Sequence, residues 1–196
     1  KYIGDAIMAV FPESPVTAVR AAVGMQRATV DFNRDHPGLP DIDIGVAINT
    51  GTIMLGIVGE KERIESTVIS DVVNVASRLE GMNKEFGSKV TISGAVYREI
   101  HEAGFTVRLL GRIKVRGRDE AVAVYEVLDA EPEEVRREKL AAAEGLQQAL
   151  ELLHTGRSAE AEEAAKVLRA LQQRYPRDRA VGYYRNRIKV SGSGAV

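Results

Sequence analysis

The chain has 196 residues, of which 44% are hydrophobic and 28% charged, the balance of a globular protein with one good core and a small appendage. Its 27 basic and 28 acidic side chains give a formal net charge of −1, which argues against a nucleic-acid partner. There is no cysteine, so a disulfide framework, a thiolate zinc site and a cysteine nucleophile are excluded. No apolar run reaches the ~18 residues of a membrane span.

Residues 1–11 contain two apolar runs around the pair Gly4-Asp5. Glycine adopts positive φ and aspartate hydrogen-bonds its own backbone, so this stretch predicts a β-hairpin with a carboxylate at its tip. That carboxylate is either a solvated turn residue or a ligand for a hard cation such as Mg²⁺. The chain begins at Lys1 inside a predicted strand, so we expect the sequence to start partway through a domain.

The next segments alternate between helix and strand signals. Ser14-Pro15 gives an N-cap and a first-turn proline for a helix that runs to Phe32. Apolar residues at every second position predict a strand over 42–48, and a turn at 49–51 then predicts a hairpin with a partner strand over 53–58. We expect a polar loop over 59–66.

A second core-facing helix is predicted to follow Asp71 and to end at Gly87. Asn74 and Arg78 lie one turn apart on this helix, on a face rotated away from the apolar one. Further along, the sequence predicts a strand over 89–92, a short helix from Ser93 to His101, and a last hairpin with strands over 106–115 and 122–128. This order predicts an α+β fold with helices on one face of a largely antiparallel sheet.

The composition changes after residue 128, which predicts a domain boundary. Residues 129–134 are expected to be a charged linker, 135–188 a small helical hairpin, and 189–196 a flexible Ser/Gly-rich tail. The hairpin resembles one tetratricopeptide unit, present in a single copy. One such unit cannot bury its own apolar face, so we expect it to dock on another surface.

Four segments stand out together, at residues 1–5, 45–51, 67–80 and 114–118. They include the run Val-Asn-Val-Ala-Ser-Arg-Leu-Glu and a Lys-x-x-Gly-Asp hairpin, a specific combination. Over residues 1–128 these segments resemble the catalytic domain of class III adenylate/guanylate cyclases. The resemblance implies a ferredoxin-like sheet and a head-to-tail homodimer with two active sites at its interface.

The resemblance also implies a role for each candidate site residue. Asp5 matches one of two aspartates that hold two Mg²⁺ (or Mn²⁺) ions per site. Asn74 matches the residue that positions the ribose, and Arg78 the one that stabilises charge on the phosphates, which suits its planar, permanently charged fork. Arg116 falls where a basic residue reaches the terminal phosphates, with Arg118 as a second candidate.

Lys1 and Thr67 fall where the family distinguishes purines. A lysine can donate to N1 of adenine and a threonine hydroxyl can accept from the adenine amino group, so the implied substrate is ATP and the products are cyclic AMP and pyrophosphate. Asp5 of one protomer would complete the site formed by the other five residues. The implied location is cytoplasmic, with any sensor or membrane segment upstream of Lys1.

One departure from the family leaves alternatives open. The family's first metal aspartate lies in an upstream Phe-x-Asp strand that has no counterpart here, so either the sequence begins downstream of it or the domain is inactive. The alternatives to an adenylate cyclase are a guanylate cyclase and a non-catalytic module that dimerises or senses nucleotide, whose helical hairpin binds a protein partner. Asn74 and Arg78 could also be a solvated helix face, and Arg116 an exposed strand residue.

We assign no role to the remaining charged groups singled out by the sequence. The histidines are interpreted as surface or capping residues. Arg136, Arg137 and Lys139 are interpreted as solvated helix charges.

Overall fold

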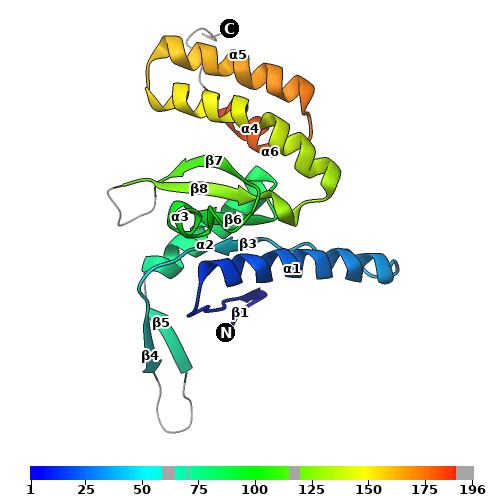
Figure 1. Ribbon diagram of the computed structural model, residues 1–196, viewed down its shortest axis with the longest axis vertical. Helices are drawn as coiled ribbons and strands as arrows, with labels where there is room; N and C mark the ends of the chain where they lie inside the picture. Colours follow the sequence, from blue (N-terminus) through cyan, green and yellow to red (C-terminus); the bar gives the residue numbers. More distant parts are fainter. Residues whose placement is uncertain (59–64, 70, 115–119, 189–196) are drawn as a thin grey trace.

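A four-stranded mixed sheet lies at the centre of the molecule (Figure 1). The computed structural model describes residues 1–58, 65–69, 71–114 and 120–188, and for 55–58 and 65–69 it describes the backbone. The strand order is β3-β6-β8-β7, with β3 parallel to β6 and the other pairs antiparallel. The strands are β3 (Val46–Ile48), β6 (Val90–Ser93), β7 (Val107–Ile113) and β8 (Val122–Val127).

Helices cover both faces of this sheet. Helices α1 (Pro15–Asp35) and α3 (Gly94–Ile100) pack on one face, and α2 (Asp71–Phe86) packs on the other together with the C-terminal helices. Along β8, Tyr125 and Val127 face α1 and α3, whereas Val124 faces α2. The α+β class is confirmed, but the helices are not confined to one face, because successive strand residues carry apolar groups on both sides.

The predicted helix starts are confirmed by their caps. The Oγ atom of Ser14 accepts a hydrogen bond from the backbone N–H of Val16 at 3.2 Å at the start of α1. Ser93 does the same for Val96 at 3.3 Å at the start of α3. These hydroxyls satisfy N–H groups that have no partner inside their helices. None of the helices in the described part of the chain is long and apolar enough to cross a membrane.

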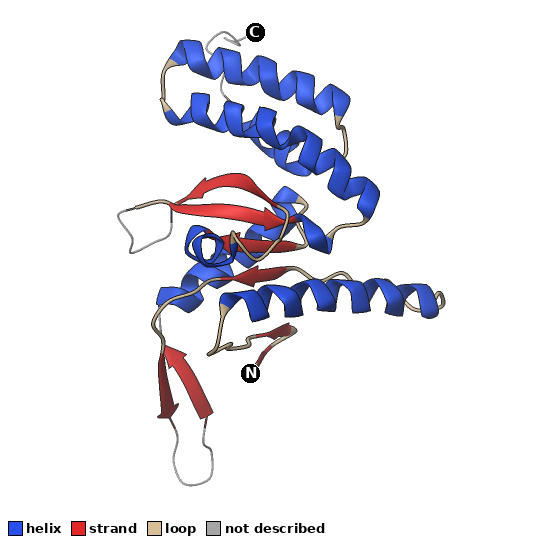
Figure 2. Cartoon of the chain, viewed as in Figure 1, coloured by secondary structure: helices blue, strands red, loops and turns tan. Residues whose placement is uncertain are grey.

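The expected hairpin between 42–48 and 53–58 is wrong. Strand β3 pairs with β6, whereas β4 (Met54–Val58) pairs with β5 (Glu65–Ile69) in an antiparallel arm that projects from the domain (Figure 2). Alternating apolar residues identify a strand but not its partner, which is chosen by contacts distant in the sequence. Strand β5 begins at Glu65, so the predicted polar loop does not extend to residue 66. The intervening residues 59–64 lie outside the described part.

The N-terminal hairpin is confirmed. Strands β1 (Tyr2–Ile3) and β2 (Ala6–Ile7) pair around Gly4, which has a φ of 63° that glycine adopts without steric cost. The hairpin forms a separate two-stranded sheet. In Figure 1 it lies below α1, and both it and the β4–β5 arm are on the side of the molecule away from the C-terminal helices.

Three helices follow the sheet, after the short 3₁₀ helix η1 (Leu128–Ala130). They are α4 (Glu133–His154), α5 (Ser158–Arg174) and α6 (Arg179–Arg187). Their apolar faces dock on the sheet and on α2, as a single helical unit requires, and share one core with them. The fully buried members of this core include Leu79, Phe86, Leu110, Leu146 and Leu168. The predicted tail at 189–196 lies outside the described residues.

A buried charged network fastens α6 to the sheet. The guanidinium of Arg108 on β7 donates to Glu126 on β8 at 2.7 Å and to both carboxylate oxygens of Asp178 at 2.6 and 3.1 Å. Asp178 is also the N-cap of α6, where it accepts from the N–H of Ala180 at 3.1 Å. Burial opposes the charged form of Arg108, but the two carboxylates outweigh it and raise the pKa of the guanidinium.

Lys139 on α4 joins the same network, so its interpretation as a solvated helix charge is wrong. Its ammonium group donates to Glu126 at 2.5 Å, to Glu131 at 2.6 Å and to the carbonyl of Gly87 at 2.8 Å, and only 4% of the residue is exposed. The sequence places it correctly on a helix, but the partners that bury it come from three other segments. Burial raises the pKa of Glu131, against the lowering effect of the Lys139 ammonium.

Candidate active site

Asp5, the predicted metal ligand, is exposed at the tip of the β1–β2 hairpin. Among the residues that the structure describes, no group of three or more His, Asp or Glu side chains could hold a metal ion. The hairpin supplies one carboxylate for a metal ion, that of Asp5. Mg²⁺ is commonly held by one or two carboxylates together with substrate phosphates, so the donor that is present fits that ion.

Asn74 and Arg78 lie on the exposed side of α2, as their spacing predicted. The opposite side of the helix is fixed in the core by Val75, Leu79 and Phe86, which are fully buried. The two polar side chains thus project from a rigid helix. This arrangement suits a site that must hold its groups in fixed positions.

The loop after β3 also holds the start of α2, a role that the sequence reasoning missed. The side-chain amide of Asn49 donates to the carbonyl of Val72 at 3.0 Å. Gly51 has a φ of 154°, and a Cβ atom there would lie 2.7 Å from Cγ2 of Val72. The glycine thus permits a close approach of the loop to the helix. The Asn-Thr-Gly turn was the available signal, but it was interpreted as a hairpin turn.

The three predicted substrate-binding residues are described to different degrees. Lys1 is exposed beside the hairpin, and its backbone amino group donates to the carbonyl of Met8 at 2.9 Å. Thr67 lies on β5, where its backbone pairs with Gly56. Arg116 lies outside the described residues, as does Arg118. In the sequence, both residues fall between β7 and β8.

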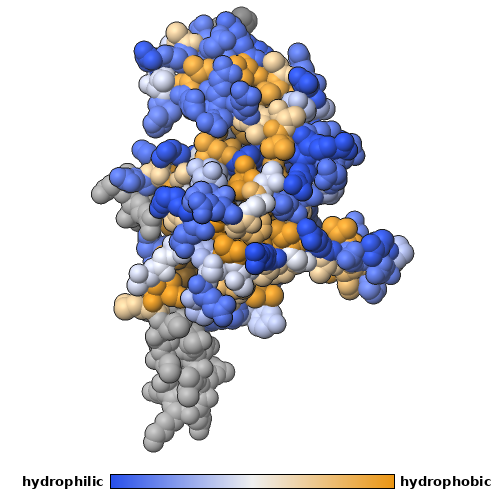
Figure 3. Space-filling view, viewed as in Figure 1, coloured by the Kyte–Doolittle hydropathy of each residue, from blue (hydrophilic) through white to orange (hydrophobic). Residues whose placement is uncertain are grey.

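The hairpin and α2 are not bonded to each other through their candidate site residues in the part of the chain that the structure describes. Within the described ranges, no hydrogen bond or ion pair joins Asp5 to Asn74 or Arg78. The surface near the hairpin is instead apolar: Tyr2 is 81% exposed and Ile7 63%. Figure 3 shows further hydrophobic residues at the surface along α1, where Val30 is 59% exposed. Exposed apolar area of this kind is typical of an interaction surface.

The chain thus forms an α+β domain with exposed polar residues on α2 and at the tip of the hairpin. Residues 1–128 match the family model described as the adenylate and guanylate cyclase catalytic domain. The chain therefore belongs to this family.

Two relatives similar in sequence to this chain are named adenylate cyclases. The chain is 45% identical over 136 residues to an adenylate cyclase of Anabaena cylindrica, which covers 65% of this chain and 27% of that protein. It is 41% identical over 145 residues to the terminal-differentiation-specific adenylate cyclase of Dictyostelium discoideum, covering 69% of this chain and 7% of that protein. The chain thus spans about a quarter or less of the length of these two relatives.

Solved structures show the same fold. A bacterial light-regulated adenylyl cyclase matches with a TM-score of 0.57 and 25% identity, over 71% of this chain and 44% of that one. The adenylyl cyclase CyaB from P. aeruginosa matches with a TM-score of 0.50 and 25% identity, over 65% of this chain and 69% of that one. The guanylyl cyclase Cya2 matches with a TM-score of 0.51 and 25% identity, over 65% and 68%.

Proposed function

We propose that this chain is the catalytic part of an adenylate cyclase that converts ATP to 3′,5′-cyclic AMP and pyrophosphate. The observation that carries the proposal is the pair Asn74 and Arg78, one turn apart on the exposed face of a helix whose other face is buried, in a chain of the cyclase family. Two of the relatives described above are named adenylate cyclases, which favours ATP over GTP. Lys1 supports the same choice, since an ammonium group can donate to N1 of adenine but not accept the proton of guanine N1–H.

The proposed active site needs two copies of the chain in a head-to-tail dimer. Lys1, Thr67, Asn74 and Arg78 of one protomer bind the base, ribose and phosphates, and Asp5 of the other protomer completes the site. The exposed apolar residues around the hairpin support this arrangement, because a dimer would remove them from water. The absence of bonds among Asp5, Asn74 and Arg78 within one described chain is also consistent with a shared site.

Each side chain has a defined task in the proposed reaction. The 3′-hydroxyl of the ribose attacks the α-phosphorus in line with the departing pyrophosphate, and the amide of Asn74 orients the ribose for that attack. The guanidinium of Arg78 stabilises the charge that develops on the phosphate oxygens. Arg116, or Arg118 beside it, binds the terminal phosphates. Asp5 would hold Mg²⁺ or Mn²⁺, two ions per site in the proposal, which would lower the pKa of the attacking hydroxyl.

The test is the formation of cyclic AMP from ATP with Mg²⁺ or Mn²⁺ by the whole protein that contains this chain. Arg78→Ala should lower kcat by about a hundredfold or more, since it removes a charge that acts in the transition state. Lys84→Ala is the matched control, because Lys84 is an exposed cation on the same helix without an assigned role. A protein that binds ATP but forms no cyclic AMP would contradict the catalytic proposal and favour the nucleotide-sensing module. A greater kcat/KM for GTP would identify a guanylate cyclase instead.

A further inference from the structure

The C-terminal end of α2 is contacted by the three-helix unit α4–α6. Helix α2 ends at Phe86, and Gly87 after it has a φ of 64°, the left-handed conformation that commonly closes a helix. The ammonium group of Lys139 on α4 donates to the carbonyl of Gly87 at 2.8 Å. A Cβ atom at Gly87 would lie 2.7 Å from Cδ of Arg179, so the glycine also allows α6 to pack directly against this end of α2.

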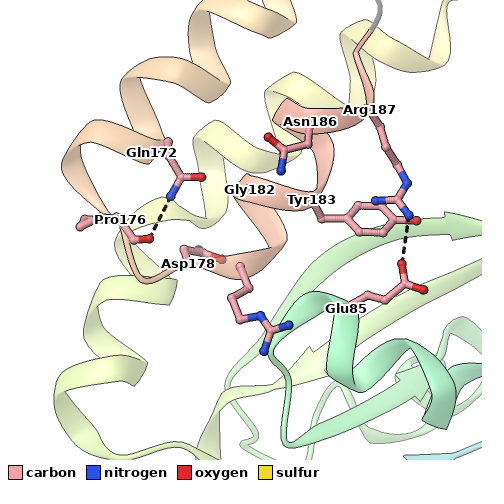
Figure 4. A pocket seen from close by; sticks show the side chains of 9 residues that line it. Glu85, Gln172, Pro176, Asp178, Gly182, Tyr183, Asn186 and Arg187 are labelled. Carbon is pink, nitrogen blue, oxygen red and sulfur yellow. Dashed lines mark hydrogen bonds and ion pairs between the residues drawn. The ribbon is translucent and has the colours of Figure 1, made fainter.

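Aromatic and charged side chains of α6 add contacts to the same end of α2. The ring of Tyr183 meets the fully buried ring of Phe86 edge-on, with centroids 4.8 Å apart. The guanidinium of Arg187 lies 3.6 Å from the centroid of the Tyr183 ring and pairs with Glu85 at 3.2 Å, as Figure 4 shows. Each of residues 85–87 is therefore in contact with α4 or α6.

The helix that receives these contacts also carries two candidate site residues. Phe86 lies eight residues after Arg78 in the sequence, which is about 12 Å along a helix. The start of α2 is held separately, by the hydrogen bond from Asn49 to the carbonyl of Val72. Because its backbone hydrogen bonds keep a helix of this length nearly rigid, a shift at the end of α2 also displaces the side chains at positions 74 and 78. Misplacing catalytic groups by about 1 Å can lower a rate about a hundredfold.

We propose that the three-helix unit positions Asn74 and Arg78 for catalysis by fixing the end of α2, and that Tyr183 is a positioning residue in this contact. The proposal rests on the proposed function, because it takes Asn74 and Arg78 as the groups that act on the ribose and the phosphates. Helices α4 and α6 follow residues 1–128, the segment that matches the family model, so the catalytic unit of this chain extends through α6. Loss of the contact lowers the rate of the chemical step and leaves recognition of the base unchanged.

The test compares Tyr183→Ala with Tyr175→Ala in the whole protein. Tyr183→Ala removes the ring that contacts Phe86 and Arg187. Tyr175→Ala is the matched control: Tyr175 belongs to the same unit and is 9% exposed, and its ring pairs with none of the other aromatic rings in the described part of the chain. Because losing one of several contacts shifts the helix by less than about 1 Å, we expect Tyr183→Ala to lower kcat about tenfold with an unchanged KM for ATP. Tyr175→Ala should keep the wild-type kcat.

A second comparison shows whether the effect acts through α2. In an Arg78→Ala background, one of the groups that Tyr183 positions is already absent, so Tyr183→Ala should lower kcat by a smaller factor than it does in the wild type. The same factor in both backgrounds would overturn the positioning role and indicate general loosening of the fold. Equal kcat values for Tyr183→Ala and Tyr175→Ala would overturn it as well.

Hydrogen exchange separates this inference from the proposed function, because the measurement needs no activity. Tyr183→Ala should speed amide exchange in the last turn of α2, residues 83–86, and Tyr175→Ala should leave it at the wild-type rate. Unchanged exchange in Tyr183→Ala would overturn the inference even in an active enzyme. If the wild-type protein makes no cyclic nucleotide, the proposed function fails, and with it the catalytic role of this contact, whereas faster exchange in Tyr183→Ala would still show that α6 fixes the end of α2.

Discussion

Replacing Arg108 with methionine tests the buried network that fastens the C-terminal helices to the sheet. The side chains of Arg108 and Glu126 have no solvent-exposed area, and that of Asp178 is 1% exposed. Water therefore cannot replace the four hydrogen bonds that Arg108→Met removes, one to Glu126, two to Asp178 and one to the backbone carbonyl of Lys139. Breaking a buried ion pair from one side costs about 3–5 kcal/mol, because the remaining carboxylates stay buried without their cation.

The assay is urea unfolding followed by circular dichroism, with Arg112→Met as control. Arg112 lies on the same strand but is exposed, so its replacement should change the free energy of unfolding by no more than about 0.5 kcal/mol. Adding Asp178→Asn to Arg108→Met should cost less than Asp178→Asn costs alone, since the shared bond is already lost. Equal losses for Arg108→Met and Arg112→Met would refute the view that this network is sealed from water and joins the helices to the sheet.

Three further predictions concern pH, packing and base recognition. Because folding raises the pKa of Glu131 above its ordinary value of 4.5, its contribution to stability is full below that pH and is lost as the pH rises through the raised pKa. Glu131→Gln should remove this loss, so the free energy of unfolding in urea should rise for the variant relative to the wild type from pH 4.5 upward. Parallel curves of unfolding free energy against pH would contradict this prediction. Leu146→Ala in the shared core should cost about 2–5 kcal/mol in the same assay, against less than about 0.5 for exposed Leu140→Ala. Lys1→Glu should lower the ratio of kcat/KM for ATP to that for GTP, and an unchanged ratio would exclude Lys1 from base recognition.

Local signals in the sequence were sufficient for most of the individual elements. Ser14 and Ser93 correctly predicted the starts of two helices through their capping chemistry, and Gly4 correctly predicted the N-terminal hairpin. Each of these signals is read within a few residues of the chain. The exposed positions of Asn74 and Arg78 likewise followed from the period of one helix.

Features that depend on distant partners were not predicted from the sequence. The pairing of β3 with β6 brings Val46 beside Val90, and no local pattern specifies that choice. The sequence does not distinguish Lys139 from a solvated lysine, because its burial depends on Glu126 and Glu131, which the fold brings around it. The burial of Arg108 was not predicted for the same reason, since its partners Glu126 and Asp178 are distant in the sequence. The roles of the six candidate site residues remain predictions, since they depend on a ligand and on a second chain.

In the proposed dimer, each active site takes Asp5 from one protomer and Arg78 from the other. The most direct measurement mixes two inactive variants, Asp5→Asn and Arg78→Ala, and assays cyclic AMP formation after subunit exchange. A mixed dimer has one intact site, and random pairing makes half of the dimers mixed, so we expect about a quarter of wild-type activity. A mixture no more active than either variant alone, beside an active wild type, would contradict the shared site.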